Sequence, residues 1–111
     1  MPLLSVSTSI KVTEKNLFLK NCSEFVSKLT NKPQQFIMVR LFDETPIYFN
    51  FDQSPSCFID LKSIGALNPS VMSKEISLFI SNQIGIPANR IYICFADIEA
   101  SNWAWNGKTF G

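Results

Sequence analysis

The sequence contains an internal repeat, because residues 3–43 align with residues 57–97 without a gap when the chain is shifted by 54 positions. Apolar residues in the middle of each copy recur with the spacing of one helix face. The first copy carries Phe18, Cys22, Phe25 and Val26, and the second carries Met72, Ile76, Phe79 and Ile80. Nine aligned pairs are identical: Ser9/Ser63, Ile10/Ile64, Lys20/Lys74, Ser23/Ser77, Phe25/Phe79, Ser27/Ser81, Pro33/Pro87, Ile37/Ile91 and Asp43/Asp97.

Each copy predicts a strand, a helix and a second strand. The helices should end at Asn31 and Gly85, because both residue types tolerate the left-handed conformation and a proline follows two residues later in each copy. Asn68 is a good N-cap for the second helix, with Pro69 in its first turn. The expected elements cover residues 3–9, 14–30 and 36–42 in the first copy, and residues 57–63, 69–84 and 90–96 in the second.

A strand-helix-strand unit within one sheet is parallel and crosses over with a right hand. Two such units side by side give an α/β (α+β) fold, with a four-stranded mixed sheet and both helices on one face. We expect residues 1–111 to form a single domain that contains both repeats. The segment Pro46–Phe51 alternates enough for a short strand, and the aromatic tail after Asp97 could add another.

The strands that follow the two helices are nearly continuous apolar runs, a pattern typical of strands covered on both faces. Two helices cover only one face of the expected sheet. An apolar sheet face of this size rarely stays in contact with water, so we expect a homo-oligomer whose sheets pack around an axis. The alternative is a monomer with an unusually large exposed apolar surface.

Composition excludes several classes of function. The formal net charge is +1 and the basic residues are scattered, which argues against a nucleic-acid-binding surface. The chain has no histidine and only three distant cysteines, so we expect neither a metal site nor a disulfide framework. No Gly-rich phosphate loop is present, and we expect no cofactor. No stretch resembles a membrane span or a signal peptide, which favours a cytoplasmic protein.

The second residue is a candidate catalytic group. A small residue behind Met1 usually allows removal of the methionine, which would leave Pro2 as a free secondary amine. Burial or a nearby cation lowers the pKa of such an amine below its ordinary value near ~8. A neutral amine can take a proton from carbon or attack a carbonyl. The alternative is that Pro2 only precedes an edge strand, where its missing N–H is harmless.

Several motifs together carry a family resemblance. They are the Pro2 start, the two repeats, Asn31-Lys32-Pro33, Ser63-Ile64-Gly65, Arg90-Ile91-Tyr92-Ile93 and Trp105-Asn106-Gly107-Lys108-Thr109-Phe110. In this order and over the whole chain, they resemble the macrophage migration inhibitory factor (MIF) family of the tautomerase superfamily. The resemblance implies a homotrimer whose sheets surround a central channel. It also implies three active sites at the subunit interfaces, each built around the N-terminal proline.

The resemblance assigns roles by position. Pro2 would be the catalytic base, and Lys32 would bind a substrate carboxylate and help to keep Pro2 neutral. The backbone N–H of Ile64 would meet the substrate, and Tyr92 would come from the neighbouring subunit. Each position has a simpler interpretation from the residues alone. Lys32 is a favourable cation after a helix, Ile64 is a core residue, and Tyr92 is a buried strand tyrosine.

Further positions are implied to line the pocket: Leu3, Phe36, Cys94, Trp103, Trp105 and Phe110. Cys94 stands where the best-known members carry an asparagine, so one polar contact to a phenolic substrate is lost. Phe36 replaces a tyrosine that is frequent at the pocket rim. The Cys-x-x-Cys motif of animal members is absent, since Ser56 and Ile59 occupy its positions, and thiol-disulfide chemistry has no visible basis.

The resulting functional hypothesis is keto–enol tautomerisation of an aromatic α-keto acid such as phenylpyruvate, with dopachrome as a further tautomerase substrate. A second hypothesis is a MIF-like signal protein that binds a receptor after export without a signal peptide and keeps the pocket as a vestige. A third is a different reaction at the same proline, such as dehalogenation or hydration. Members of that kind usually pair the proline with arginines and acidic residues, and neither Arg40 nor Arg90 lies in a matching motif.

Overall fold

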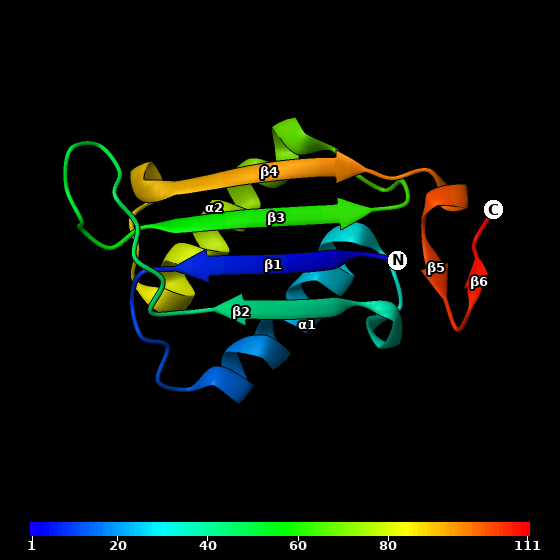
Figure 1. The fold of residues 1–111 in the computed structure, drawn as a ribbon, viewed down its shortest axis with the longest axis horizontal. Helices are drawn as coiled ribbons and strands as arrows, with labels where there is room; N and C mark the ends of the chain where they lie inside the picture. The colour runs from blue at the N-terminus through cyan, green and yellow to red at the C-terminus, as the bar shows by residue number, and fades with distance from the viewer.

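A four-stranded mixed sheet forms the centre of the molecule, and the computed structural model describes all residues from 1 to 111. Its strands lie in the order β2-β1-β3-β4 (Figure 1). The strands are β1 (Leu3–Thr8), β2 (Met38–Phe42), β3 (Cys57–Ser63) and β4 (Ile91–Asp97). The helices are α1 (Lys15–Thr30) and α2 (Pro69–Ile84), and short 3-10 turns η1 (Gln34–Phe36), η2 (Ala88–Arg90) and η3 (Ala100–Asn102) precede or follow the strands.

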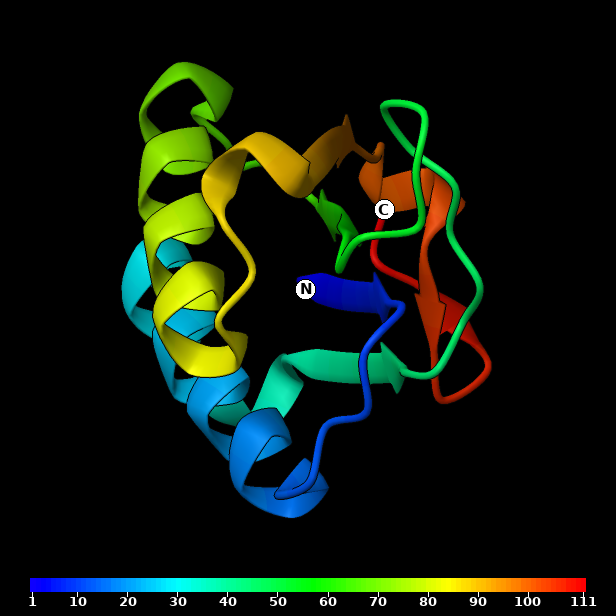
Figure 2. The ribbon, with the colours of Figure 1, turned by 90° about the vertical axis from the view of Figure 1, so that its left-hand side faces the viewer.

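The strand pairing makes two β-α-β units related by a pseudo-two-fold axis. Strand β1 runs parallel to β2 and antiparallel to β3, and β3 runs parallel to β4. Both helices cover the same face of the sheet, as the turned view shows (Figure 2). The predicted fold class and helix placement are therefore confirmed. No helix has the length and apolar character that crossing a membrane requires.

The helix ends follow from the repeat. Asn31 and Gly85 both adopt the left-handed conformation, with φ of 56° and 74°, as predicted for residues that end a helix. Asn68 is the N-cap of α2 and Pro69 begins it, which confirms the predicted start. The Asn68 side chain does not bond the helix backbone, however. Its Oδ1 instead accepts a hydrogen bond from Ser70 Oγ at 3.2 Å.

The hydrophobic core lies between the helices and the sheet. The apolar residues that the repeat aligns supply much of it, since Phe18, Cys22 and Val26 of α1 and Met72, Ile76 and Ile80 of α2 are all buried. The remaining aligned pair, Phe25 and Phe79, is half-buried. Their rings stack on each other at 4.0 Å between centroids with an angle of 6° between planes. The two copies of the repeat therefore meet directly at this pair.

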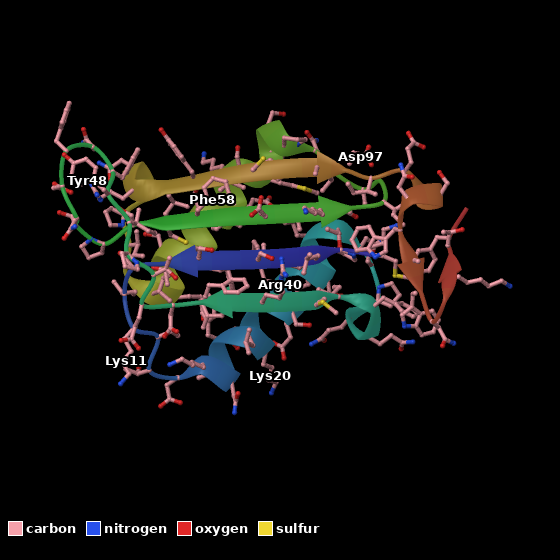
Figure 3. The ribbon with its side chains drawn as sticks, viewed as in Figure 1. Lys11, Lys20, Arg40, Tyr48, Phe58 and Asp97 are labelled. Atoms are coloured by element: carbon pink, nitrogen blue, oxygen red, sulfur yellow. The ribbon has the colours of Figure 1, made fainter.

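The face of the sheet without helices is apolar at its ends and polar across its middle. One row of paired residues there consists of Arg40, Ser5, Asp60 and Cys94, and Arg40 Nε donates a hydrogen bond to Ser5 Oγ at 3.0 Å. Arg40 and Phe58 both lie over this face (Figure 3). Four large apolar side chains on it are exposed: Met38, Phe42, Phe58 and Tyr92. The expectation of an apolar second face is thus correct only for parts of it.

Two irregular segments extend from opposite ends of the sheet, on the side away from the helices (Figures 1 and 2). The expected strand Pro46–Phe51 is wrong, because Asn50 and Phe51 both have positive φ and turn the chain sharply between Phe49 and Asp52. Two consecutive left-handed residues cannot belong to a strand. The tail does form a small hairpin of β5 (Ala104–Trp105) and β6 (Lys108–Thr109), as the sequence suggested.

Candidate functional site

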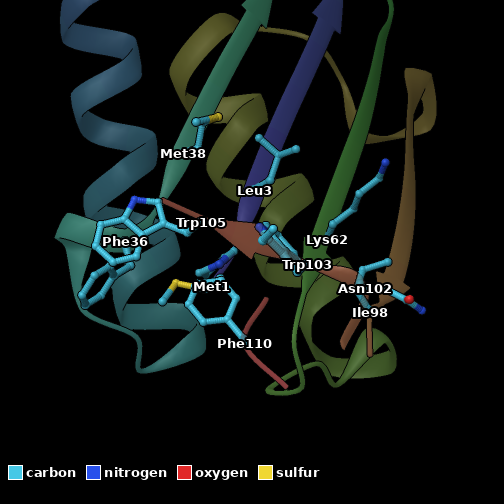
Figure 4. Close-up of a pocket in the computed structure, with 12 residues that line it drawn as sticks. Met1, Leu3, Phe36, Met38, Lys62, Ile98, Asn102, Trp103, Trp105 and Phe110 are labelled. Atoms are coloured by element: carbon cyan, nitrogen blue, oxygen red, sulfur yellow. The ribbon is translucent and has the colours of Figure 1, made fainter. Parts of the chain in front are cut away.

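A cavity of about 470 Å³ opens at the end of the sheet where the chain begins (Figure 4). Most of the residues that surround it are apolar. They come from the N-terminus, from η1 and β2, from the end of β3 and from the tail: Met1, Pro2, Leu3, Phe36, Met38, Lys62, Ile98, Asn102, Trp103, Ala104, Trp105 and Phe110. Six of the predicted site residues are therefore close together, namely Pro2, Leu3, Phe36, Trp103, Trp105 and Phe110.

Pro2 is fully buried at the base of this cavity. The Met38 N–H donates a hydrogen bond to the Pro2 carbonyl oxygen at 3.1 Å, which ties the residue to the start of β2. Strand β1 lies between β2 and β3, so the interpretation of Pro2 as a residue before an edge strand is wrong. While Met1 is attached, the Pro2 nitrogen is an amide nitrogen with no basic lone pair. A free Pro2 amine in this position would be surrounded by apolar side chains.

The N-terminal amine has an unusual electrostatic environment. Burial lowers the pKa of the Met1 amine below its ordinary value, and the positive charge of Lys32 lowers that pKa further. Lys32 does not line the cavity itself, but its charge acts on the N-terminus. Its carbonyl oxygen accepts a hydrogen bond from Ser27 Oγ at 2.6 Å, which fixes the turn after α1. The chain thus favours a neutral amine where the cavity begins.

The tail forms the outer wall of the cavity. Asn106 and Gly107 both have positive φ, which is the geometry of a tight two-residue turn between β5 and β6. The hairpin is held in register where the Phe110 N–H donates to the Trp103 carbonyl oxygen at 3.0 Å. Trp105 packs edge-to-face against Phe36, with ring centroids 6.2 Å apart. The tail is therefore joined to η1 across the cavity, which produces an aromatic rim.

Ile64 lies in the turn after β3 and does not line the cavity within one chain. Two hydrogen bonds hold this turn against β4: the Gly65 N–H donates to Asp97 Oδ1 at 2.9 Å, and the Ile98 N–H donates to the Ser63 carbonyl oxygen at 2.9 Å. The Ile64 N–H donates no hydrogen bond within the chain. Ile64 is half-buried rather than part of the closed core.

Tyr92 and Cys94 lie on β4, away from the cavity of their own chain. Tyr92 pairs with Phe58, whereas the cavity lies at the level of Lys62, which pairs with Ala96. Four residues of strand separate these levels, which is about 13 Å along the sheet. Both side chains are exposed, and Tyr92 is 60% exposed. The interpretation of Tyr92 as a buried strand tyrosine is therefore wrong for the isolated chain.

The cavity also contains residues that the sequence analysis missed: Met1, Met38, Lys62, Ile98, Asn102 and Ala104. Two of them could have been found by strand pairing. Leu3 was expected in the wall, and Met38 and Lys62 are its direct neighbours on either side of β1, so they share its face. Lys62 is the only charged side chain that lines the cavity. Ile98, Asn102 and Ala104 lie in irregular chain, where no periodic signal exists.

The remaining chemistry of the chain is limited. No arginine and no carboxylate lines the cavity, so Arg40 and Arg90 do not support a dehalogenase or hydratase site there. No three His, Cys, Asp or Glu side chains are grouped in a way that would hold a metal ion. Burial raises the pKa of both the Cys22 and the Cys57 thiol to about 12. Neither thiol is therefore a nucleophile near neutral pH.

Comparison with known proteins agrees with this geometry. The family model for macrophage migration inhibitory factor matches residues 1–111. A macrophage migration inhibitory factor homolog of Brugia malayi is 34% identical over 115 residues, with all of both chains covered.

Solved structures of similar proteins have the same fold. The homologue from Prochlorococcus marinus is 35% identical, covers 98% of this chain and 99% of its own, and superposes with a TM-score of 0.92. The factor from Trichinella spiralis is 30% identical, covers 97% of this chain and 99% of its own, and gives a TM-score of 0.91. The family match over the full chain, the relatives at this identity and the shared fold lead to one conclusion: this protein belongs to the macrophage migration inhibitory factor family.

Proposed function

We propose that this protein is a keto–enol tautomerase for aromatic α-keto acids of the phenylpyruvate type, with Pro2 as the general base. The observation that carries the proposal is the position of the N-terminus. Pro2 is buried at an apolar cavity, and burial and the Lys32 charge lower the pKa of the adjoining Met1 amine; the same surroundings would act on a free Pro2 amine. A neutral amine beside a bound keto acid can remove a proton from the carbon next to the carbonyl.

The mechanism begins with removal of Met1, which converts the Pro2 nitrogen from an amide into a secondary amine. That nitrogen takes the benzylic proton of the keto form, and the electrons of the broken C–H bond form the enolate. The protonated Pro2 then supplies a proton to the enolate oxygen, directly or through water, and returns to its neutral form. Lys32 does not line the cavity of the single chain, but its positive charge acts on the N-terminus; in this proposal it attracts the carboxylate and stabilises the developing negative charge. No cofactor takes part in this scheme.

The aromatic walls supply binding and exclude water. Phe36, Trp105 and Phe110 present ring faces and edges to an aromatic substrate, which is worth about 0.5–1.5 kcal/mol for each well-placed pair. A dry cavity also keeps the Pro2 amine unprotonated. Dopachrome, a planar bicyclic quinone that carries a carboxyl group, is a second proposed substrate for tautomerisation in this cavity.

The complete site is proposed to form between subunits of a homotrimer. The sheet face without helices exposes Met38 by 63%, Phe42 by 46%, Phe58 by 41% and Tyr92 by 60%. Burial of these side chains against a second copy of the chain removes their apolar area from water. In this arrangement Tyr92 and Cys94 of a neighbouring subunit close the cavity, and the unbonded Ile64 N–H meets the substrate. Light scattering after size exclusion tests the assembly, and a monomer at micromolar concentration contradicts it.

The catalytic proposal is tested by following phenylpyruvate enol–keto conversion with purified protein whose intact mass is short by one methionine. Pro2→Gly should lower kcat by about 10²–10⁴-fold, the usual contribution of a general base. A form that retains Met1 should be equally inactive, because its Pro2 nitrogen is an amide. Pro46→Gly, the same change at an exposed proline outside the cavity, is the matched control and should keep wild-type activity. Near-normal turnover by Pro2→Gly or by the Met1 form would refute the proposal.

The second candidate is a signal protein that binds a receptor, and the names of the relatives favour it, since they are called macrophage migration inhibitory factors. In that case the cavity is not needed for the physiological activity. A macrophage migration assay with wild-type protein and with Pro2→Gly separates the two functions. Inhibition that survives Pro2→Gly supports the signal function, and inhibition that disappears with turnover links it to the enzyme.

A further inference from the structure

Arg90 is anchored by more partners than any other charged residue of the chain. Its side chain is only 12% exposed, although it lies at the junction of η2 and β4. Its Nε donates to the Pro55 carbonyl oxygen at 3.1 Å and to Ser56 Oγ at 3.0 Å. Its Nη2 donates to the carbonyl oxygens of Phe49 at 3.0 Å and Ser54 at 3.2 Å. The same Nη2 forms an ion pair with Asp52 Oδ1 at 2.9 Å.

These partners all belong to one segment, residues 49–56, which we call the anchored loop. Arg90 therefore holds both ends of the anchored loop against the start of β4. Asp52, the acid of the ion pair, stays charged, because the Ser54 N–H and the Arg90 charge lower the pKa of its carboxyl. The loop is irregular, and Arg90 bonds it at five of its residues, while Thr8 and Ser9 bond only its last residue, Ser56.

The guanidinium of Arg90 also lies against one ring of an aromatic pair, Phe49 and Tyr92. It lies over the ring of Phe49, 5.3 Å from the centroid, which is within the range of a cation–π interaction. The Phe49 ring packs edge-to-face against Tyr92, with centroids 4.9 Å apart and an angle of 64° between planes. One side of the Tyr92 ring is therefore supported, while the residue as a whole stays 60% exposed.

An exposed tyrosine on a strand normally samples several rotamers, and fixing it on binding costs conformational entropy. The contact with Phe49 restricts the Tyr92 ring before any ligand arrives. We propose that Arg90 and Phe49 are positioning residues that hold Tyr92 in the orientation in which it contacts substrate in a neighbouring subunit's cavity. This inference rests on the proposed function, in which Tyr92 completes that cavity. It explains why an exposed tyrosine is packed against Phe49, which in turn lies under the Arg90 guanidinium.

The proposal predicts an effect on substrate binding without an effect on proton transfer. Phe49→Leu keeps an apolar side chain but removes the aromatic ring, and it should raise KM for phenylpyruvate by about twofold to tenfold. The turnover number kcat should stay within about twofold of wild type, because Phe49 contacts Tyr92 and is not itself part of the proton transfer by Pro2. Phe49→Tyr restores the ring and should restore the wild-type KM. Gln53→Ala, an exposed residue of the same loop, is the control and should leave KM unchanged.

A double-mutant cycle with Tyr92→Ala decides whether Phe49 acts through Tyr92. Tyr92→Ala should raise KM alone, and adding Phe49→Leu to it should produce no further increase. Equal effects of Phe49→Leu with and without Tyr92, an unchanged KM, or a parallel loss of kcat would each overturn the positioning role. Phe49→Met replaces Phe49→Leu where circular dichroism shows that the leucine variant does not fold.

The same experiment separates this inference from the function on which it rests. Wild-type protein without turnover would refute the tautomerase proposal, and the positioning role would fall with it. Wild-type turnover combined with additive effects in the cycle would refute only the positioning role. An unchanged KM in Tyr92→Ala would overturn both the substrate contact of Tyr92 and the inference built on it, while leaving Pro2 as the base.

Discussion

The two ends of the sheet are built from equivalent positions of the two repeats, but the cavities at these ends contain different functional groups. The end with the N-terminus contains the cavity of about 470 Å³. The opposite end contains a smaller cavity of about 190 Å³. Four residues of the first cavity have structural equivalents in the second. Because Leu3 pairs with Met38 as Phe58 pairs with Tyr92, Pro2, Leu3, Phe36 and Met38 correspond to Cys57, Phe58, Arg90 and Tyr92.

The difference between the ends arises from where the chain begins. Pro2 has no chain before it once Met1 is removed, so an amine can lie in the first cavity. Its equivalent, Cys57, directly follows the anchored loop, and the Arg90 guanidinium is bonded to Ser56 and Ser54 of that loop. Lys32, whose charge acts on the N-terminus, corresponds to Ile86, which is fully buried and apolar. The repeat supplies two similar frameworks, and only the terminal one can carry basic chemistry.

The largest effect is expected from the core that both ends share. Ile80 and Val26 are equivalent and completely buried. Ile80→Ala should lower the free energy of unfolding by about 2–5 kcal/mol, and Val26→Ala should lower it by less because valine has one carbon fewer. Urea unfolding measures both, and Leu78→Ala, at a 62% exposed site of α2, should cost less than about 0.5 kcal/mol. A large loss at one site with none at the other would show that the two units do not form one core.

The next effect concerns the cation that distinguishes the two ends. Lys32→Met gives the first end the apolar character that Ile86 has at the second. Loss of a charged partner for the carboxylate, about 1.5–3 kcal/mol, should reduce kcat/KM for phenylpyruvate by roughly 10- to 150-fold. The pKa of the N-terminal amine should also rise, because removal of a positive charge favours the protonated form.

The pH profile provides the independent measurement for this variant. The base is active only when neutral, so activity rises with pH through the pKa of the amine, and Lys32→Met should move this rise to higher pH. Lys28→Met, which removes an exposed cation in the last turn of α1, should change neither kcat/KM nor the profile. An unshifted profile in Lys32→Met would contradict the electrostatic role of Lys32, and an unchanged kcat/KM would contradict its role in binding.

The fold could be predicted because the repeat and the apolar periodicity act locally. The spacing of Phe18, Cys22 and Val26 indicates one face of a helix without reference to the rest of the chain. Asn31 and Gly85 end helices because their backbones tolerate the left-handed conformation. The anchored loop could not be predicted in this way. Alternating residues suggested a strand at Pro46–Phe51, whereas long-range bonds from Arg90 outweigh that weak preference and a tight turn forms at Asn50 and Phe51.

The site was predictable where it depends on sheet order and less so where it depends on assembly. Pro2, Leu3 and Phe36 meet because β1 and β2 are neighbours, which follows from the repeat. Lys62 was missed although register alone would have placed it beside Leu3. No periodic rule indicates which tail residues turn back onto η1. The positions of Tyr92 and Cys94 relative to a cavity depend on a second subunit, which the pattern of one chain does not contain.

The smallest effect is expected at a pair of aspartates that the repeat also makes equivalent. Asp43 Oδ2 accepts a hydrogen bond from the Val12 N–H at 3.0 Å and pairs with Lys15 at 3.1 Å, and Asp97 Oδ1 accepts one from the Gly65 N–H at 2.9 Å. The Val12 bond first, and Lys15 second, lower the pKa of the Asp43 carboxyl. Its stabilisation is therefore complete above the unfolded pKa near ~4 and disappears as the pH falls through the lower folded value.

Asp43→Asn should accordingly lower the urea midpoint modestly at neutral pH, and its difference from wild type should shrink below pH ~4. Asp97→Asn should cost less at neutral pH, because Asp97 has no ion pair in addition to its backbone bond. Glu24→Gln, an exposed acid of α1, should follow the wild-type curve. If Asp97→Asn lowered the urea midpoint more than Asp43→Asn, the turn that carries Ile64 would depend more on its aspartate than the equivalent turn of the first repeat. The two ends of the sheet would then differ in the bonds that stabilise them as well as in their functional groups.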